Sequence, residues 1–137
     1  MKRLILFLVF LVLAERGWST TSVTGEVSGT WTKSGSPYSV TGDIQVPAGK
    51  ELVIEEGVVV RFNQETGLFV YGSLMCLGTE TEVIVFTGSS GSWKGIEVSG
   101  DARFEYSQVL YGGTNIDVNG GTVTITDCSI GSATYGI

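Results

Sequence analysis

The chain has 137 residues, of which 42% are hydrophobic, 10% aromatic and 16% charged, with 20 Gly, 2 Pro, 2 Cys and no His. This length fits one modest domain. The formal charge of −6, from 8 Lys and Arg against 14 Asp and Glu, lacks the basic footprint expected for binding nucleic acid or anionic lipid. Without His, the chain offers neither a thiolate and imidazole zinc cluster nor a Ser-His or Cys-His nucleophile pair.

The first residues have the pattern of a secretory signal. Two basic residues precede an unbroken apolar run from Leu4 to Ala14, and this run is too short to span a bilayer. We predict that residues 1–14 are a signal peptide, with cleavage between residues 14 and 19, and that the protein is secreted or lies at the cell surface without a membrane span. An uncleaved anchor is the alternative, because charged residues follow the run.

The two cysteines, Cys76 and Cys128, both lie in segments of alternating apolar character. Export to an oxidising compartment permits a disulfide between them. A thiol in such a segment also behaves as a small core hydrophobe. We favour two buried free thiols and leave the disulfide as the alternative.

From residue 38 onward the sequence consists of short apolar and polar alternations separated by Gly, Asn, Ser and Thr, which indicates strands and turns. One alternation recurs with an aliphatic residue at the same phase, at steps of 24, 28, 20 and 21 residues: Ile44, Leu68, Ile96, Ile116 and Ile137. Each step holds about three short strands. Such units stack with parallel strands and bury one continuous core, so the chain is predicted to be an all-β solenoid of about four coils.

An antiparallel sandwich is the rival fold, but it does not explain a pattern that returns at one phase. Residues 20–41 are predicted to form an N-terminal cap, and residues 42–137 the coils, which remain open at the C-terminus. The pairs Gly112-Gly113 and Gly120-Gly121 are interpreted as corners that need positive φ.

Several stretches carry a resemblance to one family: residues 29–31, 46–58, 86–87, 93–96 and 124–130. They resemble secreted right-handed parallel β-helix repeat proteins of the pectate-lyase-like superfamily, over residues 29–137. The resemblance implies a right-handed parallel β-helix with three short strands per coil, and it implies little about activity. The last residues, from Tyr135 to Ile137, begin a further coil without a cap, so we interpret the chain as a fragment of a longer β-helix or as one whose edge another chain occupies.

Alternation sends one row of side chains outward from the recurring segments. Gln45, Phe69, Glu97 and Asp117 are predicted to form this outward strip, with Asn119 beside it. Glu97 and Asp117 would be neighbours on adjacent coils, where they could hold Ca²⁺, the one cofactor considered, or contact a sugar. The alternative, which we favour, is that these side chains keep an exposed strand soluble.

No catalytic residue is assigned. The lyases and hydrolases of the superfamily use constellations that are missing here: the chain has no His and no Asp-Asp pair, and the basic Arg103 lies on another strand from Glu97. We therefore expect a secreted or cell-surface structural or interaction module that contacts a polysaccharide or cell-surface glycan, and no enzyme in this chain alone. The alternative is the N-terminal part of a polysaccharide lyase or glycoside hydrolase whose active site lies mostly beyond Ile137.

Overall fold

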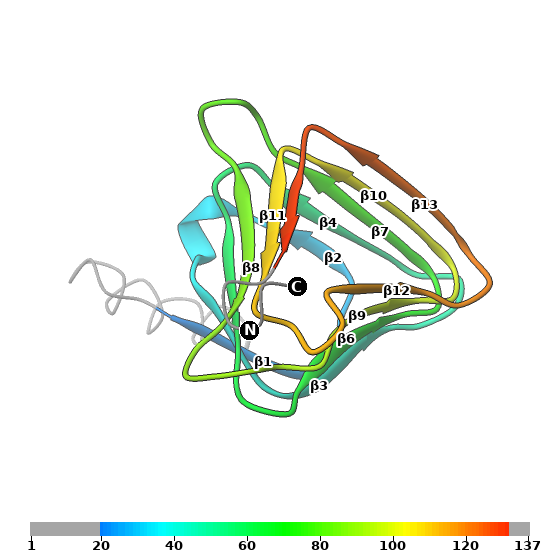
Figure 1. Ribbon diagram of the computed structural model, residues 1–137, viewed down its shortest axis with the longest axis horizontal. Helices are drawn as coiled ribbons and strands as arrows, with labels where there is room; N and C mark the ends of the chain where they lie inside the picture. Colours follow the sequence, from blue (N-terminus) through cyan, green and yellow to red (C-terminus); the bar gives the residue numbers. More distant parts are fainter. Residues whose placement is uncertain (1–19, 132–137) are drawn as a thin grey trace, which may run out of the picture.

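The computed structural model describes residues 20–131, which form a stack of parallel β-coils (Figure 1). The predicted signal peptide and the segment from Tyr135 to Ile137 lie outside the described residues. One 3₁₀ turn, η1 (Lys33–Gly35), interrupts the strands. The strands are β1 (Thr21–Glu26), β2 (Gly29–Trp31), β3 (Tyr38–Val46), β4 (Glu51–Glu55), β5 (Val59–Phe62), β6 (Gly67–Val70), β7 (Ser73–Leu77), β8 (Ile84–Gly88), β9 (Gly95–Val98), β10 (Asp101–Glu105), β11 (Ser107–Leu110), β12 (Ile116–Val118), β13 (Thr122–Thr126) and β14 (Ser129–Gly131).

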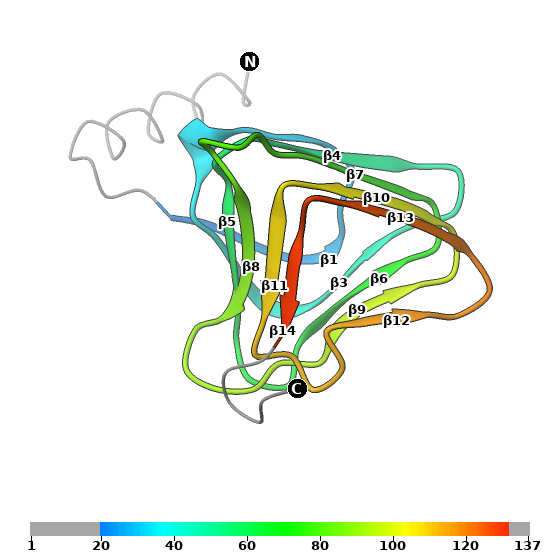
Figure 2. The same ribbon diagram turned by 45° about the horizontal axis from the view of Figure 1, so that its top comes forward.

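The coils have three sides, and Figure 2 shows their triangular outline. We call the sides by one member strand each. The β9 face contains β6, β9, β12 and the end of β3, the β10 face contains β2, β4, β7, β10 and β13, and the β11 face contains β5, β8, β11, β14 and the start of β3. Strand β3 serves two faces, because Tyr38–Val40 pair with β5 while Ile44–Val46 pair with β6. This strand joins the two faces into one nine-stranded sheet, while the β10 face is a separate sheet of five strands.

The strand register confirms the repeat that the sequence predicted. Ile44 pairs with Leu68, Leu68 with Ile96, and Ile96 with Ile116, so the recurring aliphatic residues form one inward row. The first three are at most 1% exposed. Because every coil adds residues to the same rows, the core is continuous along the stack, and its largest buried side chains include Trp93, Phe62, Phe86 and Phe104.

The β10 face has five strands, so the described residues make five turns, one more than the four predicted. The additional turn comes from residues 20–41, where a cap was predicted. There β1 pairs with β3 and β2 pairs with β4, both in parallel. Two of its inward positions are glycines, Gly25 opposite Ile44 and Gly29 opposite Leu52, so the apolar alternation that marks the other coils is missing from this one.

The corner between the β9 and β10 faces is built from stacked glycines, for a reason that differs from the predicted one. Of the four glycines interpreted as positive-φ corners, Gly120 has φ +100°, and the other three do not have positive φ. Gly121 is required because a Cβ there would lie 1.7 Å from the carbonyl oxygen of Gly100. A Cβ on Gly100 would likewise lie 2.1 Å from the carbonyl oxygen of Gly72. Close approach between coils, rather than backbone handedness, therefore excludes side chains at this corner.

Both cysteines are free thiols, as predicted. Cys76 is fully buried in the core, whereas Cys128 is only half-buried, so the prediction of two buried thiols is right for Cys76 alone. Cys128 shares an inward row with the buried Ser107, and it is exposed because it belongs to the last coil that the structure describes.

Candidate ligand-binding strip

The four predicted strip residues lie in one row on the outside of the β9 face. Gln45 pairs with Phe69, Phe69 with Glu97, and Glu97 with Asp117, each on the next coil. Their neighbours along each strand, which point inward, form the core. Parallel register thus sets these side chains about 4.8 Å apart in steps along the stack. The structure places all four where the alternation predicts.

Asn119, the fifth predicted residue, joins the row from the chain segment that follows β12. Its Nδ2 donates a hydrogen bond to Oε2 of Glu97 at 2.7 Å. This contact fixes the half-buried Glu97 side chain in one orientation. Asp117, one coil further on, is exposed.

A lysine and an aspartate that were not assigned to the strip complete it at the side of Phe69. The Lys94 ammonium lies 2.9 Å from Oδ2 of Asp43 and 5.6 Å from the centroid of the Phe69 ring. The other carboxylate oxygen of Asp43 accepts a hydrogen bond from the backbone N–H of Gly67 at 3.0 Å. The lysine is therefore held over the aromatic face by an ion pair and a cation–π contact. Asp43 could have been found from its phase, because it directly precedes the inward Ile44 as Gly67 precedes Leu68.

These side chains surround a shallow open pocket of about 150 Å³. Its lining residues are Phe69, Lys94, Gly95, Ile96, Glu97, Thr114 and Asp117. The pocket thus combines an aromatic ring, an ammonium group and two carboxylates within one depression. Gln45 belongs to the row and lies outside the pocket lining.

The strip offers few ligands to a metal ion. Within residues 20–131, no group of three or more His, Cys, Asp or Glu side chains is arranged to hold a metal. Glu97 and Asp117 supply two carboxylates, whereas Ca²⁺ takes six to eight oxygen ligands. A Ca²⁺ ion here would need most of its ligands from water or from a bound sugar.

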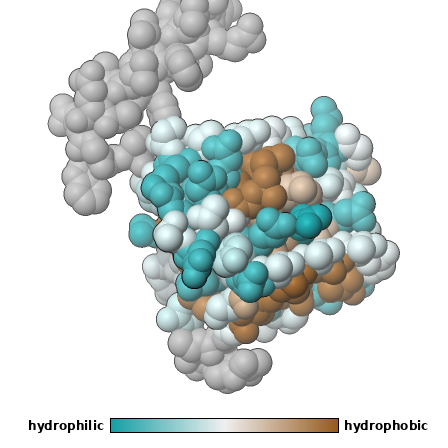
Figure 3. Space-filling model, turned by 90° about the horizontal axis from the view of Figure 1, so that it is seen from above, coloured by the Kyte–Doolittle hydropathy of each residue, from teal (hydrophilic) through white to brown (hydrophobic). Residues whose placement is uncertain are grey.

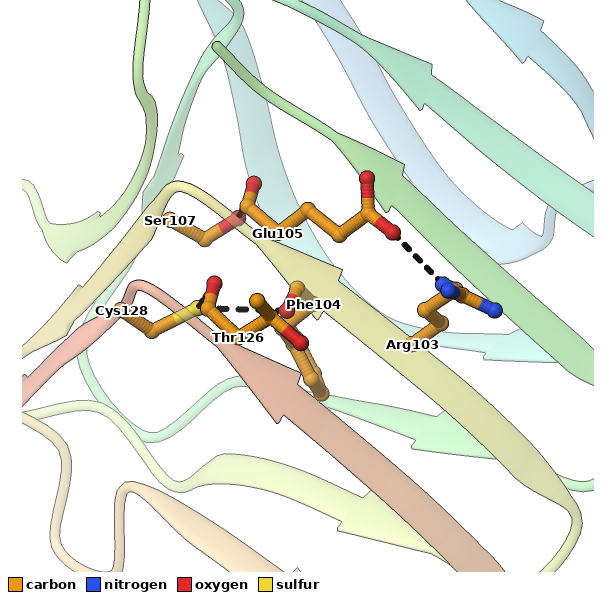
Figure 4. A network of polar contacts seen from close by, with 6 residues as sticks. All are labelled: Arg103, Phe104, Glu105, Ser107, Thr126 and Cys128. Carbon is orange, nitrogen blue, oxygen red and sulfur yellow. Dashed lines mark hydrogen bonds and ion pairs between the residues drawn. The ribbon is translucent and has the colours of Figure 1, made fainter. Parts of the chain in front are cut away.

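Polar groups also gather where β10 and β13 turn into β11 and β14 (Figure 4). Arg103 Nε donates to Oε2 of Glu105 at 2.7 Å, and Ser107 Oγ donates to the Glu105 carbonyl oxygen at 3.1 Å. One coil further on, Cys128 Sγ lies 3.2 Å from the carbonyl oxygen of Thr126. Serine and cysteine thus make the same contact to the residue two places earlier, which marks them as structural equivalents rather than as nucleophiles. The Arg103 guanidinium is paired within its own strand and does not face the strip.

Two groups near this corner have shifted ionisation. A neighbouring charge on Asp127 is the main cause that raises the pKa of the Tyr106 phenol, with desolvation and a hydrogen bond to Asp127 adding to it. Burial is the main cause that raises the pKa of the Cys76 thiol, and the charge of Cys128 adds to the effect. Both shifts favour the neutral forms, so neither group is an activated nucleophile.

The tryptophans are part of the core and are unavailable as sugar-stacking platforms. Trp93 stacks on Phe62 with ring centroids 4.0 Å apart, and its Nε1 donates to the carbonyl oxygen of Leu110 at 2.8 Å. Trp31 stacks on Tyr38 at 4.4 Å. Phe69 is therefore the aromatic ring that the strip presents. No helix in the described part of the chain has the length and apolar character needed to cross a membrane.

These features define the molecule as a parallel β-solenoid with an outward polar and aromatic strip. One curated protein is similar over a short stretch: 54 residues, or 39% of this chain, are 39% identical to "Protein bark beetle" of Drosophila melanogaster. That stretch is 2% of the Drosophila protein, so the chain spans a very small part of it. No family model matches the chain, and no solved structure matches it.

Proposed function

We propose that this chain is a secreted or cell-surface interaction module whose outward strip binds a glycan. The observation that carries the proposal is the pocket on the β9 face, where Phe69, Lys94, Glu97 and Asp117 converge from three consecutive coils. Sugar sites commonly pair an apolar ring face with a few polar groups that fix orientation. This depression has both.

The strip favours a neutral or amino sugar over a uronate. Lys94 is already paired with Asp43, so its charge is largely compensated within the site. Glu97 and Asp117 have no basic partner among the ion pairs of the described residues. The chain as a whole also carries a formal charge of −6. A polyanionic sugar chain would meet net repulsion, whereas hydroxyl and amino groups can donate hydrogen bonds to the two carboxylates.

The long, straight stack supports a polymer rather than a single sugar as the ligand. The row from Gln45 to Asp117 crosses four coils, which at about 4.8 Å per step corresponds to a length of about 14 Å. A chain of two to three sugar units could lie along it. Gln45 would then contact a unit outside the pocket.

Binding to a panel of immobilised neutral, amino and acidic polysaccharides, with and without Ca²⁺, tests the proposal. We expect Phe69→Ala to weaken binding about tenfold, and the double change Glu97→Gln with Asp117→Asn to weaken it further. Met75→Ala is the matched control, because Met75 is a half-buried outward residue on the β10 face. Product assays for sugar-chain cleavage on the same panel would detect a catalytic role.

The proposal fails if the parent protein binds none of the polysaccharides. It also fails if Met75→Ala reduces binding as much as Phe69→Ala does. A requirement for Ca²⁺ that disappears in the Glu97→Gln and Asp117→Asn protein would instead assign the two carboxylates to an ion that bridges protein and sugar.

A further inference from the structure

The end of the stack formed by β12, β13 and β14 differs from the rest of the molecule in its exposed apolar surface. Val118 is 51% exposed, Ile125 46% and Ile130 40%. Their row neighbours one coil below, Val98, Phe104 and Val109, are 0% exposed. The same rows that build the core therefore continue to this end and lie uncovered there. Figure 3 shows hydrophobic residues gathered along the lower edge of the molecule in that view.

The backbone at this end is also unpaired on one side. Within residues 20–131, β12 and β14 are the two terminal strands of the nine-stranded sheet, and β13 is a terminal strand of the five-stranded sheet. Each presents a free row of N–H and C=O groups in the direction of the stack axis. An apolar patch bordered by three free strand edges is a template for another polypeptide.

A second copy of this chain is a poor occupant of that surface. Its N-terminal coil would place Gly25 and Gly29 in the rows of Ile116 and Val123, and these have no side chains to cover the aliphatic residues. It would also continue the acidic outward row by placing Glu26 next to Asp117. Two C-terminal ends facing each other would both be acidic, because Asp117 and Asp127 are the charged residues between positions 116 and 131.

We propose that this end binds a β-coil of a different polypeptide, whose three strands pair in parallel with β12, β13 and β14. The partner coil carries aliphatic or aromatic residues in the three inward rows, so that they cover Val118, Ile125 and Ile130. It carries lysine or arginine at the outward positions above Asp117 and Asp127. The interaction is separate from the glycan strip, because it uses the inward rows and the backbone edges rather than the outer face.

The probe is a 21-residue peptide with the sequence of residues 94–114, which already provides suitable inward residues at Ile96, Val98, Phe104 and Val109. Lysine replaces the residues equivalent to Glu97 and Tyr106, the positions that stack on Asp117 and Asp127. The peptide is titrated to about 1 mM into the isotopically labelled protein, and backbone amide signals are followed by NMR. A peptide with glutamate at those two positions, and one with a scrambled sequence, are the controls.

We expect saturable signal changes confined to β12, β13, β14 and their corners, with slowed amide exchange on the free edges. Affinity for the lysine peptide should fall about tenfold in Ile125→Asn, and about tenfold when the peptide carries glutamate instead. The Leu77→Asn change is the matched control, because Leu77 is an outward hydrophobic residue on the β10 face that is 36% exposed.

Three results would overturn the inference. The first is the absence of any change at 1 mM of the lysine peptide. The second is equal binding of the scrambled peptide. The third is a concentration-dependent dimer of the protein alone in sedimentation velocity, abolished by Ile125→Asn, which would make a second copy the occupant. Failure of the glycan panel would leave this inference intact, since the two surfaces do not share side chains.

Discussion

The glycine corner provides the sharpest test of coil stacking, through the substitution Gly100→Ala. The added Cβ would lie 2.1 Å from the carbonyl oxygen of Gly72 and 2.5 Å from that of Tyr71. Both contacts are to backbone, so no side chain can rotate away. The coil must shift by about 1 Å to reach an ordinary contact distance, and this shift disturbs the hydrogen bonds between neighbouring coils.

The expected loss follows from two terms of opposite sign. Overpacking costs about 1–3 kcal/mol, and stretching one inter-coil hydrogen bond, such as that from Asp101 N to Gly72 O at 2.9 Å, costs about 1 kcal/mol. Alanine also restricts the unfolded chain, which returns about 0.4–1 kcal/mol. The net decrease in the free energy of unfolding is therefore about 2–3 kcal/mol.

The assay is urea unfolding followed by the fluorescence of the buried Trp93, with Gly113→Ala as the control. A Cβ on Gly113 would meet its nearest neighbour, the Trp93 carbonyl oxygen, at 3.5 Å, an ordinary contact, and the position is exposed. That variant should unfold within about 0.5 kcal/mol of the parent or be slightly more stable. If Gly100→Ala were also within 0.5 kcal/mol, the close stacking of carbonyl on glycine would be refuted.

Three further outcomes follow from the core, the thiols and the surface. Phe104→Ala should lower the free energy of unfolding by about 3–5 kcal/mol in the same urea assay, because Phe104 is fully buried against Phe86; a loss below 1 kcal/mol would contradict its place in the core. Because burial raises the pKa of the Cys76 thiol above its usual 9.0, the unfolded chain ionises first as the pH rises. Stability is thus retained below about pH 8.5 and falls above it, by up to about 1.4 kcal/mol per pH unit, in urea titrations between pH 7.5 and 9.5; Cys76→Ala should flatten this slope, and a slope that persists would reject the assignment. Glu82→Gln should change stability by less than about 1 kcal/mol, since its ion pair with Lys33 is exposed, and a larger loss on thermal unfolding would show that the pair anchors its loop.

The rows of the solenoid could be predicted because their signal is local and repeated. Alternation fixes which side chains of a short strand share a face, and the return of an aliphatic residue at one phase fixes which strands are stacked. Ile44, Leu68, Ile96 and Ile116 therefore aligned correctly although their spacings vary from 20 to 28 residues. The extra residues in the longer step lie in loops and do not disturb the register.

The first coil was missed because its rows are written in glycine. Gly25 and Gly29 occupy inward positions that are Ile or Leu in the coil above, so the segment appeared to be a polar cap. The Lys94–Asp43 pair was missed for another reason: its partners are 51 residues apart, on outward positions where no hydrophobic period exists. Polar outward contacts depend on loop lengths and on side-chain reach, neither of which alternation encodes.

The two candidate surfaces follow from a single property of the fold, namely that every coil repeats the same division into inward and outward rows. The outward rows are free to vary, and on the β9 face they bring Phe69, Glu97 and Asp117 together without affecting the core. The inward rows cannot vary in this way, so the last described coil necessarily presents Val118, Ile125 and Ile130. A substitution on one surface should therefore leave the other unchanged, as expected for sites more than 7–10 Å apart without shared partners. Combining Phe69→Ala with Ile125→Asn should give losses of glycan and peptide binding equal to those of the single variants, and any coupling would mean that the coils shift as a unit when either surface is occupied.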